Sequence, residues 1–495
     1  MDERRSMTAA LMVQGCGSDV GKSVLVAGLC RLFTNRGLRV RPFKSQNMSN
    51  NAAVTCDGGE IGRAQALQAH ACRAEPSTDM NPILLKPQSD LAAQLIVRGR
   101  MAGILDASAH GRDKRALLEV AVECYGRLAR EAQLVIVEGA GSPAETNLRR
   151  HDIANMGLAR ALNLPVVLVG DIDRGHVIAS LVGAHAVLDE ADRAHIRGFI
   201  INKFRGDRTL FEEGLQCIRA HTDWPSLGII PWLRQAAQLP SEDGVQLEGE
   251  GGADIGRPSR PRIVIPLLSR IANFDEFDAL RAEPNLDVQF VPPGRPLPPE
   301  AALIILPGTK STIADLAFMR AQGWDIDLLA HVRRGGRVLG ICGGYQMLGQ
   351  ALSDPEGIEG PPQSVRGLGL LEVTTVMAPH KTLRVVSGVL LPGRDPFNGY
   401  EMHVGTTEGA ATCRPLLELS DGTVDGASTA DGRIAGSYVH GLFATTAARS
   451  ALVRVLGVIP GHADHAATVD SALDGIAGAL EECLDIEALA AIASL

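Results

Sequence analysis

The sequence predicts an α/β protein of two domains, the first a P-loop-type doubly wound parallel sheet and the second another α/β unit. From residue 8 onward, short β-branched runs alternate with segments of helical period, which is typical of a parallel sheet covered by helices on both faces. The 495 residues exceed what one hydrophobic core usually organises. The 54 glycines and 4% aromatic residues indicate many tight loops between short strands.

The first domain is predicted to span residues 1–240. Its first strand is "TAALMVQG", and the segment after it spaces apolar residues at helical intervals between Val24 and Leu32 before ending at Gly37. Four later apolar runs predict further strands, "LRVRPFK", "AQLVIVEG", "NLPVVLVGD" and "IRGFIINKF". Because the carboxyl ends of parallel strands line the ligand crevice of such a sheet, polar residues at these ends are the site candidates.

A linker and a second domain follow. Residues 241–260 are acidic and glycine-rich, then rich in proline and arginine, and show no period. A second series of apolar runs, "RIVIPLL", "LDVQFV", "AALIILPG" and "GRVLGIC", predicts a second α/β domain over 261–465, with short extended segments between 366 and 440. Residues 466–495 are predicted to form a terminal helical segment.

Charge and cysteine usage narrow the partners and the compartment. A formal net charge of -9 argues against binding nucleic acid, which needs a basic surface. The nine cysteines are scattered without a C-x-x-C pair, which favours a reducing compartment. No stretch reaches the roughly 18 apolar residues that a membrane span needs. We therefore expect a cytoplasmic protein that acts on a small molecule, in an oligomeric state that the sequence does not specify.

The stretch "GCGSDVGKS", residues 15–23, predicts a phosphate-binding loop between the first strand and its helix. Five residues, one more than usual, separate Gly15 from the Gly-Lys-Ser ending. A glycine-rich turn at a helix N-terminus directs backbone N–H groups at a triphosphate, and Lys22 adds a mobile positive charge. The ATP-binding candidates are Gly15, Asp19, Gly21, Lys22, Ser23, Lys44 and Asn202.

Three residues are candidate ligands of Mg²⁺. The hydroxyl of Ser23 can bind the ion, and Glu138 ends the apolar strand "LVIVEG", where a carboxylate usually completes such a site. Glu60, in "GGEIGRAQA", is the third candidate, although an acidic residue at a helix start is nearly as well explained by the helix dipole.

Two polar segments are candidates for binding substrate or phosphate. "PFKSQNMSNNA", residues 42–52, presents Gln46 and Asn47 beside Lys44, a dense set of donors for carboxylate or phosphate oxygens, with a plain polar turn as the alternative. "DIDRG", residues 171–175, places Asp171 and Arg174 at a strand end, with a solvated loop as an equal alternative. Asn202, at another strand end, is predicted to contact the edges of adenine.

In the second domain, "GGRVLGICGGYQMLG" places Cys342 between glycines, after a strand and before a helical run. This pattern predicts a nucleophile elbow, in which a sharp turn exposes the thiol and a helix N-terminus stabilises the thiolate. The alternative is a buried structural cysteine. Backbone N–H groups at Gly343 and at Gly308, in "ILPGTKS", are candidate oxyanion donors, although the second is as easily an ordinary turn. His440, in "GSYVHGLF", is the candidate base, and His403 competes with it.

These segments in this order resemble the cobyric acid synthase family: the lengthened loop, "FKSQNMSNN", "VEGAGSPAE", "DIDRG", "INKFRGD", "ILPGTKS", "GICGGYQMLG", "GYEMHVG" and "SYVHG". The lengthened loop and "VEGAGSPAE" also resemble dethiobiotin synthetase and its relatives. The resemblance covers nearly the whole chain. It implies a first domain that uses ATP and Mg²⁺ to activate carboxylates on a corrin ring, and a class I glutamine amidotransferase domain that releases ammonia from glutamine. The implied substrate is cobyrinic acid a,c-diamide, amidated at its b, d, e and g side chains.

The resemblance also implies roles for single residues: Cys342 as nucleophile, His440 as its base, and Gln346 with the two glycines in glutamine or oxyanion binding. Many class I amidotransferases carry a glutamate two residues after the histidine, whereas this chain has Leu442 there. We therefore expect a Cys-His dyad, oriented by the backbone or by Glu401.

Three other functions stay open. The a,c-diamide synthase of the same pathway shares both domains, although "KSQNMSNNA" favours cobyric acid synthase. An amidating ligase acting on cell-wall precursors is a more distant alternative. A partitioning-type ATPase with an inert glutaminase-like module is a third, and it requires Cys342 to be idle.

Overall fold

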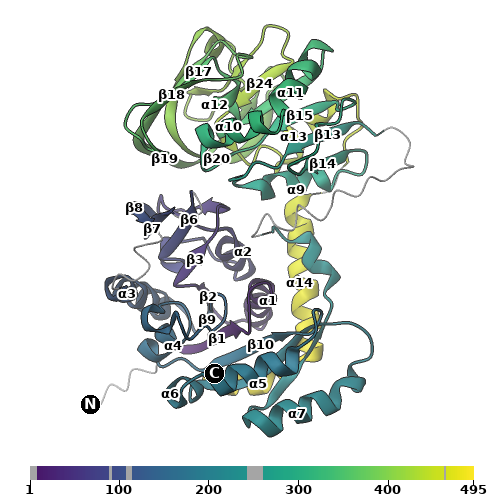
Figure 1. Cartoon of the computed structure of the whole chain (residues 1–495). Helices are drawn as coiled ribbons and strands as arrows, with labels where there is room; N and C mark the ends of the chain where they lie inside the picture. Colours follow the sequence, from purple (N-terminus) through teal and green to yellow (C-terminus); the bar gives the residue numbers. More distant parts are fainter. Residues whose placement is uncertain (1–7, 89–91, 107–113, 242–259, 462–463) are drawn as a thin grey trace.

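The computed structural model describes residues 8–88, 92–106, 114–241, 260–461 and 464–495. Within these residues the chain forms two α/β bodies, one above the other in Figure 1, and this confirms the predicted fold class. The predicted linker at 241–260 lies, apart from its two end residues, outside the described residues.

The lower body is built on a parallel sheet of six strands in the order β12-β11-β10-β1-β9-β2. Successive side chains of a strand point to opposite faces, so the two faces of β1 pack into different cores. Leu11 and Val13 face α1, whereas Ala10 and Met12 face α3, α4 and α5. The strands are β1 (Ala9–Gly15), β2 (Val40–Phe43), β9 (Leu134–Glu138), β10 (Val166–Asp171), β11 (Ile196–Phe204) and β12 (Ser226–Pro231).

Helices cover both faces of this sheet, and the phosphate-loop segment lies where β1 meets α1. The edge strand β12 is the one that the sequence patterns above do not include. The helices are α1 (Lys22–Asn35), α2 (Arg63–Ala71), α3 (Arg115–Glu131), α4 (Met156–Leu162), α5 (Val177–Val187), α6 (Glu190–Arg193) and α7 (Glu212–Thr222).

The C-terminal helices return to the first domain. In Figure 1, α14 (His465–Cys483) runs from the upper body down beside α1, and α15 (Ile486–Ala493) packs near β1. A Cβ added at Gly28 of α1 would lie 2.6 Å from side-chain atoms of both Ile476 and Leu480, so the two helices touch closely there. Arg36 also pairs with Glu481 at 2.9 Å. The last residues of the chain therefore complete the core of the first domain.

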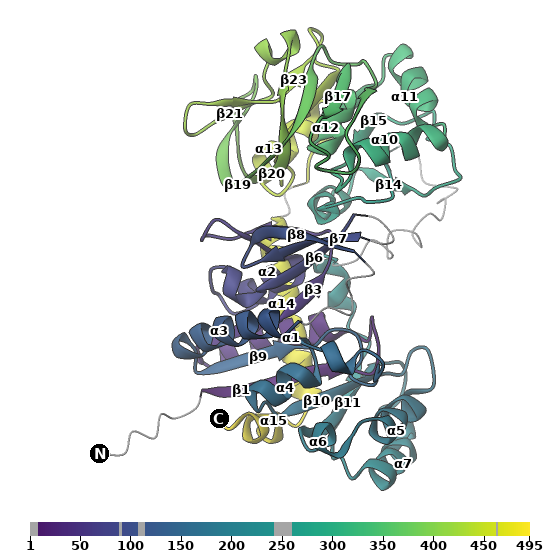
Figure 2. The ribbon, with the colours of Figure 1, turned by 60° about the vertical axis from the view of Figure 1, so that its left-hand side comes forward.

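A smaller layer of mixed strands lies between the parallel sheet and the second domain, as Figure 2 shows; β3 pairs with β6 in parallel and the other pairs are antiparallel. It consists of a four-stranded sheet in the order β3-β6-β7-β8 and a separate hairpin of β4 and β5. The segment 42–52, predicted as a polar binding segment or turn, contains β3 and the start of β4. The strands are β3 (Gln46–Met48), β4 (Ala52–Val54), β5 (Glu60–Gly62), β6 (Ile83–Pro87), β7 (Ala92–Val97) and β8 (Arg100–Asp106).

The upper body contains a second six-stranded sheet, in the order β14-β13-β15-β16-β24-β23, that is parallel except for β23. Helices α10 (Thr312–Ala321), α11 (Trp324–Arg333), α12 (Gly343–Leu348) and α13 (Thr446–Arg454) belong to this body. The strands are β13 (Arg262–Pro266), β14 (Asp287–Val291), β15 (Leu303–Leu306), β16 (Arg337–Ile341), β23 (Ala427–Ser428) and β24 (Ile434–Ser437).

A mixed sheet with two long strands completes the upper body. The two long strands, β19 (Thr374–Leu390) and β20 (Asp395–Glu408), lie in the region 366–440, where the sequence predicts short extended segments. Strand β25 (Val439–His440) pairs with β20 and so carries His440 to this sheet. The other strands are β17 (Ala351–Asp354), β18 (Gln363–Arg366), β21 (Leu417–Leu419) and β22 (Val424–Asp425).

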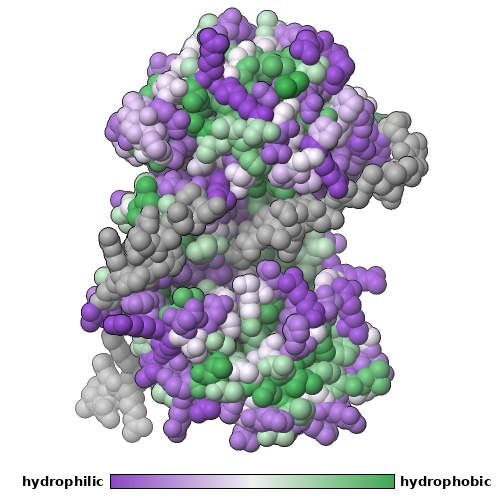
Figure 3. Space-filling model, in the orientation of Figure 1, coloured by the Kyte–Doolittle hydropathy of each residue, from purple (hydrophilic) through white to green (hydrophobic). Residues whose placement is uncertain are grey.

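On the face seen in Figure 3, hydrophilic and hydrophobic residues are interspersed over both bodies. Among the described residues, no helix is both long enough and apolar enough to cross a membrane.

Candidate active sites

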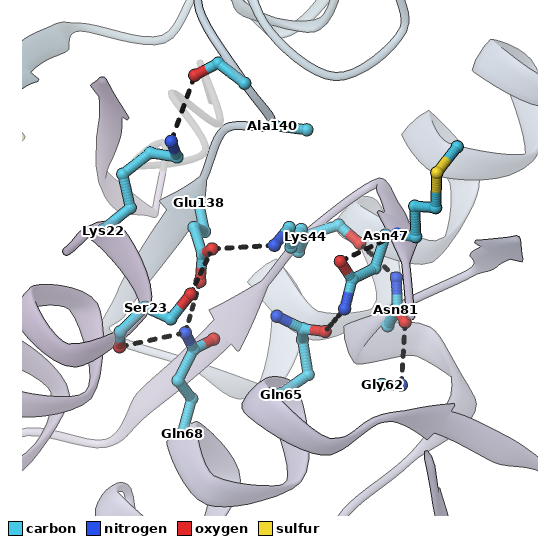
Figure 4. A network of polar contacts seen from close by, with 12 residues as sticks. Lys22, Ser23, Lys44, Asn47, Gly62, Gln65, Gln68, Asn81, Glu138 and Ala140 are labelled. Carbon is cyan, nitrogen blue, oxygen red and sulfur yellow. Dashed lines mark hydrogen bonds and ion pairs between the residues drawn. The ribbon is translucent and has the colours of Figure 1, made fainter. Parts of the chain in front are cut away.

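The predicted phosphate loop joins β1 to α1 at the carboxyl edge of the first parallel sheet (Figure 4). The Lys22 ammonium group donates hydrogen bonds to the carbonyl oxygens of Gly17 at 2.7 Å and Gly141 at 3.0 Å. The Ser23 hydroxyl donates to Oε1 of Glu138 at 2.9 Å. The ammonium and hydroxyl groups therefore lie at the start of α1, where the backbone N–H groups of a helix N-terminus favour phosphate.

Contacts from the end of β11, which is separated from β1 by β10, fix the conformation of the loop. Gly21 has a φ of 89°, and a Cβ added there would lie 2.4 Å from Nδ2 of Asn202. Asn202 donates from Nδ2 to the Val20 carbonyl at 2.8 Å, and Lys203 donates to the Asp19 carbonyl. The side-chain amide of Asn202 thus braces the loop, which is a different contact from the adenine edge that the sequence suggests.

Glu138 is a fully buried carboxylate with three side-chain donors around it. Besides Ser23, the Lys44 ammonium pairs with Oε1 at 2.8 Å and the Gln68 amide donates to Oε2 at 2.5 Å (Figure 4). Burial by itself raises the pKa of Glu138, but the charge of Lys44 and the hydrogen bonds hold this pKa below its usual value. The carboxylate is therefore ionised at neutral pH.

The donor set at this edge fits Mg²⁺ only together with phosphate oxygens. Mg²⁺ is usually held by one or two carboxylates and by the phosphates of a bound nucleotide. Here one carboxylate and one hydroxyl meet, and among the described residues no group of three or more His, Cys, Asp or Glu is placed to hold a metal. The structure brings these predicted residues to the same edge: Gly15, Asp19, Gly21, Lys22, Ser23, Lys44, Glu138 and Asn202.

Glu60, the third predicted magnesium ligand, has another place in the structure. Its carboxylate is 1% exposed, pairs with Lys86 at 2.6 Å, and also contacts Lys381 of the second domain. Burial raises the pKa of Glu60, but the two lysines lower it to about 2. Both carboxylate oxygens of Glu60 contact ammonium groups, so Glu60 ties the two domains together, and its place in a magnesium site stays a prediction.

The two polar segments are partly engaged in the protein's own contacts. Asn47 is buried and donates to Oε1 of Gln65 at 2.9 Å, so its side chain supports the fold (Figure 4). Gln46 is partly exposed. Asp171 pairs with Lys203 at 2.8 Å, and Arg174 is exposed on the loop after β10. Of the four predicted substrate residues, Arg174 is exposed, Gln46 and Asp171 are partly exposed, and Asn47 is buried.

In the second domain, Cys342 occupies the predicted sharp turn between β16 and α12. It has a φ of 51° and a ψ of -110°, a strained conformation for a residue with a side chain, of the kind that concentrates at functional sites. A Cβ added at Gly344 would lie 2.1 Å from the Leu306 carbonyl oxygen, so α12 packs directly on the sheet. The turn therefore fixes the thiol at the N-terminal end of α12.

His440 and Glu276 form a buried pair beside this thiol. Nδ1 of His440 lies 2.9 Å from Oε1 of Glu276, and both side chains are 1% exposed. Oε2 of Glu276 accepts from the Gly441 N–H at 3.1 Å, and the ring of Tyr400 stacks on His440. Burial lowers the pKa of His440, but Glu276 and the nearby Cys342 sulfur raise it to about 10. Cys342 and His440 line the same pocket, so these residues are candidates for a Cys-His-Glu triad.

Glu276 is the site residue that the sequence interpretation misses. It lies in the 3₁₀ turn Phe274–Phe277, which follows β13. One signal was available: "FDEFD" follows a predicted parallel strand, and the carboxyl ends of such strands share one edge with Cys342. That signal does not choose among Asp275, Glu276 and Asp278, because the choice depends on which carboxylate meets His440 in space.

The two other candidates for this part of the site have different partners. Glu401, considered for orienting His440, is 5% exposed and pairs with Arg384, so that hypothesis is wrong. His403, the competing base, stacks on Tyr438 with ring centroids 3.7 Å apart. Burial lowers the pKa of His403 to about 4.

Cys342 and His440 line one cavity, to which both domains contribute residues. Lys86 of β6 comes from the first domain, and Gln346 and Thr312 come from the second. Gln346 donates from Nε2 to the Val404 carbonyl at 2.9 Å and accepts from the Thr312 hydroxyl at 3.0 Å.

Both predicted oxyanion glycines lie next to residues that line this cavity. A Cβ added at Gly308 would lie 2.8 Å from Cε1 of His440, so this position leaves room for the imidazole. A Cβ added at Gly343 would lie 2.6 Å from Cγ2 of Thr309. Gly308 and Gly343 thus flank the Cys342 turn from two strand ends.

Charged groups opposite the thiol make the cavity suitable for a zwitterion. The Thr312 hydroxyl also contacts Oε1 of Glu359 at 3.1 Å. Burial raises the pKa of Glu359 to about 7, and burial together with the neighbouring Lys381 and Lys86 lowers the pKa of Lys310 to about 7. One acidic and several basic side chains therefore face the same space as Cys342.

Two family models match the two bodies. The "CobQ/CobB/MinD/ParA nucleotide binding domain" matches residues 11–246, and the "CobB/CobQ-like glutamine amidotransferase domain" matches residues 262–448. Among similar proteins, one from Caulobacter sp. (strain K31) is 64% identical over 98% of this chain and 100% of its own. One from Rhizorhabdus wittichii is 59% identical over 98% of this chain and 99% of its own. One from Methylorubrum populi is 58% identical over the same shares.

Each of these three relatives is described as cobyric acid synthase, and each match covers 98% of this chain. On this evidence the chain belongs to the cobyric acid synthase family.

Proposed function

We propose that this protein is a glutamine-hydrolysing amidoligase that converts (adenosyl)cobyrinic acid a,c-diamide into cobyric acid. It would use ATP, Mg²⁺ and glutamine to amidate the b, d, e and g carboxylates. The observation that carries the proposal is the presence, in one chain related to cobyric acid synthases, of a phosphate-loop site and a Cys342-His440-Glu276 set. Together these are the two chemistries that such an amidation needs.

The first domain activates the carboxylate. A carboxylate resists ammonia because its oxide is a poor leaving group. A carboxylate oxygen of the corrinoid attacks the γ-phosphorus of ATP, ADP leaves, and the resulting acyl phosphate carries a good leaving group. Lys22 and the loop N–H groups hold the phosphates. Ser23 and Glu138 would hold Mg²⁺, which neutralises phosphate charge when bound.

The second domain supplies ammonia. The thiolate of Cys342 attacks the side-chain amide carbon of glutamine, and backbone N–H groups near Gly308 and Gly343 stabilise the oxyanion. His440 gives its Nε2 proton to the departing ammonia, and water then hydrolyses the thioester to glutamate. Glu276 accepts from Nδ1 and stabilises the imidazolium form throughout.

The ammonia must reach the acyl phosphate without being protonated. Free ammonia is mostly ammonium near neutral pH and is then not nucleophilic, so a passage sheltered from water favours the reaction. Lys86, on β6 of the first domain, lines the cavity that holds Cys342. One residue of the first domain therefore lines the glutaminase cavity, and this contact supports a passage between the sites. The ammonia attacks the acyl carbon and phosphate leaves.

The family relatives favour this reaction over the three alternatives. A partitioning-type ATPase would use the first domain alone, and it gives no reason for a completed triad beside a cavity. The a,c-diamide synthase and a cell-wall ligase share the chemistry but differ in substrate. The decision therefore depends on which carboxylates are amidated.

Anion-exchange chromatography of the corrinoid product tests the substrate. Each amidation removes one negative charge, so cobyrinic acid a,c-diamide should move in four successive shifts and end with one free carboxylate. The a,c-diamide synthase would leave this substrate unshifted and move unamidated cobyrinic acid by two charges. A partitioning ATPase or a cell-wall ligase would shift neither corrinoid.

A further inference from the structure

The segment Ile271–Phe277, here called the strap, connects β13 to the rest of the second domain and carries Glu276. Its start is fixed to the glutaminase sheet, because the Ala272 N–H donates to the Gly308 carbonyl at 2.9 Å and Ile271 forms a bridge with Thr309. Its end holds His440 through Glu276. The residues between these two points decide how the triad carboxylate is presented.

Three successive strap residues contact the first domain. Oδ1 of Asn273 accepts from the Ala52 N–H at 3.2 Å, and the Phe274 N–H donates to Oδ1 of Asn51 at 3.3 Å. Asp275 then pairs with Arg63 at 2.8 Å. The next residue in the chain is Glu276. The first domain thus holds the strap immediately before the triad carboxylate.

These contacts are buried and conformationally demanding. Asn51, Asn273 and Asp275 are 1%, 3% and 8% exposed. Asn273 has a φ of 55°, in the left-handed region, which a residue with a side chain occupies when its surroundings fix it. Its Nδ2 also lies 3.4 Å from Nε2 of His440. The same side chain therefore touches the first domain on one side and the catalytic imidazole on the other.

The first-domain residues that contact the strap are close in sequence to residues of the phosphate-loop site. Lys44 pairs with Glu138 at the phosphate loop, and Asn51 and Ala52 follow within the same segment. Arg63 begins α2, the helix that also carries Gln68 to Glu138. The elements that hold the strap are thus the ones that border the first active site.

We infer that Arg63 and Asn51 of the first domain are positioning residues of the glutaminase, which hold the strap so that Glu276 stays aligned with His440. This inference rests on the proposed glutaminase function. The triad is complete only while these first-domain contacts hold the strap in place. Loss of the contacts misplaces the carboxylate of Glu276 and slows glutamine hydrolysis. Activation of the substrate carboxylate in the first domain stays intact.

The test uses the full chain with Arg63→Gln, which removes the charge of the ion pair with Asp275. We expect kcat for glutamine hydrolysis to fall about ten- to a hundredfold, the effect of a small misplacement of a catalytic group. KM for glutamine should change by less than threefold, because Glu276 acts on His440 and not on glutamine. Amidation with added ammonium salts should stay within twofold of wild type. Arg63→Lys should restore much of the loss.

The matched control is Arg127→Gln. Arg127 pairs with Asp79 at 2.6 Å within the first domain and is 31% exposed, against 30% for Arg63, but it does not touch the strap. It should leave the ratio of glutamine-dependent to ammonia-dependent amidation unchanged. Asp275→Asn should reproduce the effect of Arg63→Gln on glutamine hydrolysis. The double variant should hydrolyse glutamine only slightly more slowly than either single variant, because both changes break the same ion pair.

Three outcomes decide the matter. Unchanged glutamine hydrolysis in Arg63→Gln overturns the inference. Equal losses with glutamine and with ammonium also overturn it, because the contact would then serve only the fold or the first site. If wild-type protein releases no glutamate from glutamine, the proposed function fails before the inference is reached, and this control separates the two failures.

Discussion

Glu276→Gln keeps the size of the side chain and one hydrogen-bonding oxygen but removes the negative charge beside His440. Both side chains of this pair are 1% exposed, so water cannot replace the lost carboxylate. Removing one partner of a buried charged pair costs about 3–5 kcal/mol. If that cost falls on the imidazolium formed during catalysis, glutamine hydrolysis slows by about 10²- to 10⁴-fold, at 1.36 kcal/mol for each factor of ten.

The same substitution has a pH signature in stability. The pKa of His440 is raised to about 10, so the pair stabilises the fold fully below the ordinary histidine pKa of about 6.5 and loses this contribution as pH rises through about 10. The difference in Tm between wild type and Glu276→Gln should therefore be largest near pH 6 and should shrink toward pH 10.

The assay measures glutamate released from glutamine and, separately, amidation with ammonium salts. Ammonia-dependent amidation should stay near wild type. Glu401→Gln is the matched control. Glu401 is a buried glutamate of the same domain, like Glu276, but its partner is Arg384 and not His440. A folded Glu276→Gln variant that hydrolyses glutamine within threefold of wild type would refute the triad.

Three further predictions concern both sites and the interface. Cys342→Ala should abolish glutamine-dependent amidation and retain the reaction with ammonium salts; equal loss with both nitrogen sources in a folded variant would contradict its role as the nucleophile. Lys22→Ala and Glu138→Ala should show the opposite pattern, with loss of amidation from either source and surviving glutamine hydrolysis; normal ammonia-dependent turnover would remove that residue from the ATP site. Glu60→Gln should lower Tm, because Lys86 loses its buried partner. The pKa of Glu60 is lowered to about 2, so the stabilisation from its ion pairs should be complete above about pH 4.5 and should vanish as pH falls through about 2. A difference in Tm between wild type and Glu60→Gln that does not change with pH would contradict these ion pairs.

Features encoded in short stretches of chain could be predicted from the sequence. The phosphate loop is a strand, a glycine turn and a helix in sequence order, and the turn at Cys342 has the same local arrangement. Residue type, glycine spacing and period are enough to place such features, because each depends on neighbours within one or two turns of helix.

Features that depend on pairing between distant parts of the chain could not be predicted in this way. Glu276 meets His440 across 164 residues, and Glu60 meets Lys381 across 321. Periodicity does not give the partners of these residues, since a buried carboxylate looks alike in sequence whether it binds a metal, a lysine or a histidine. For the same reason, a terminal helix could be predicted from residue 466, but its return to α1 could not.

The central claim is that glutamine cleaved in the second domain supplies the amides made in the first. The direct measurement incubates the enzyme with cobyrinic acid a,c-diamide, ATP, Mg²⁺ and amide-¹⁵N-labelled glutamine in buffer with unlabelled ammonium, and determines the label in the product by mass spectrometry. The account predicts a product with four new amides, nearly all labelled, because the ammonia passes between the sites without mixing with the solvent. A product whose label follows the bulk ammonium, or an a,c-diamide that gains no amide at all, would contradict it.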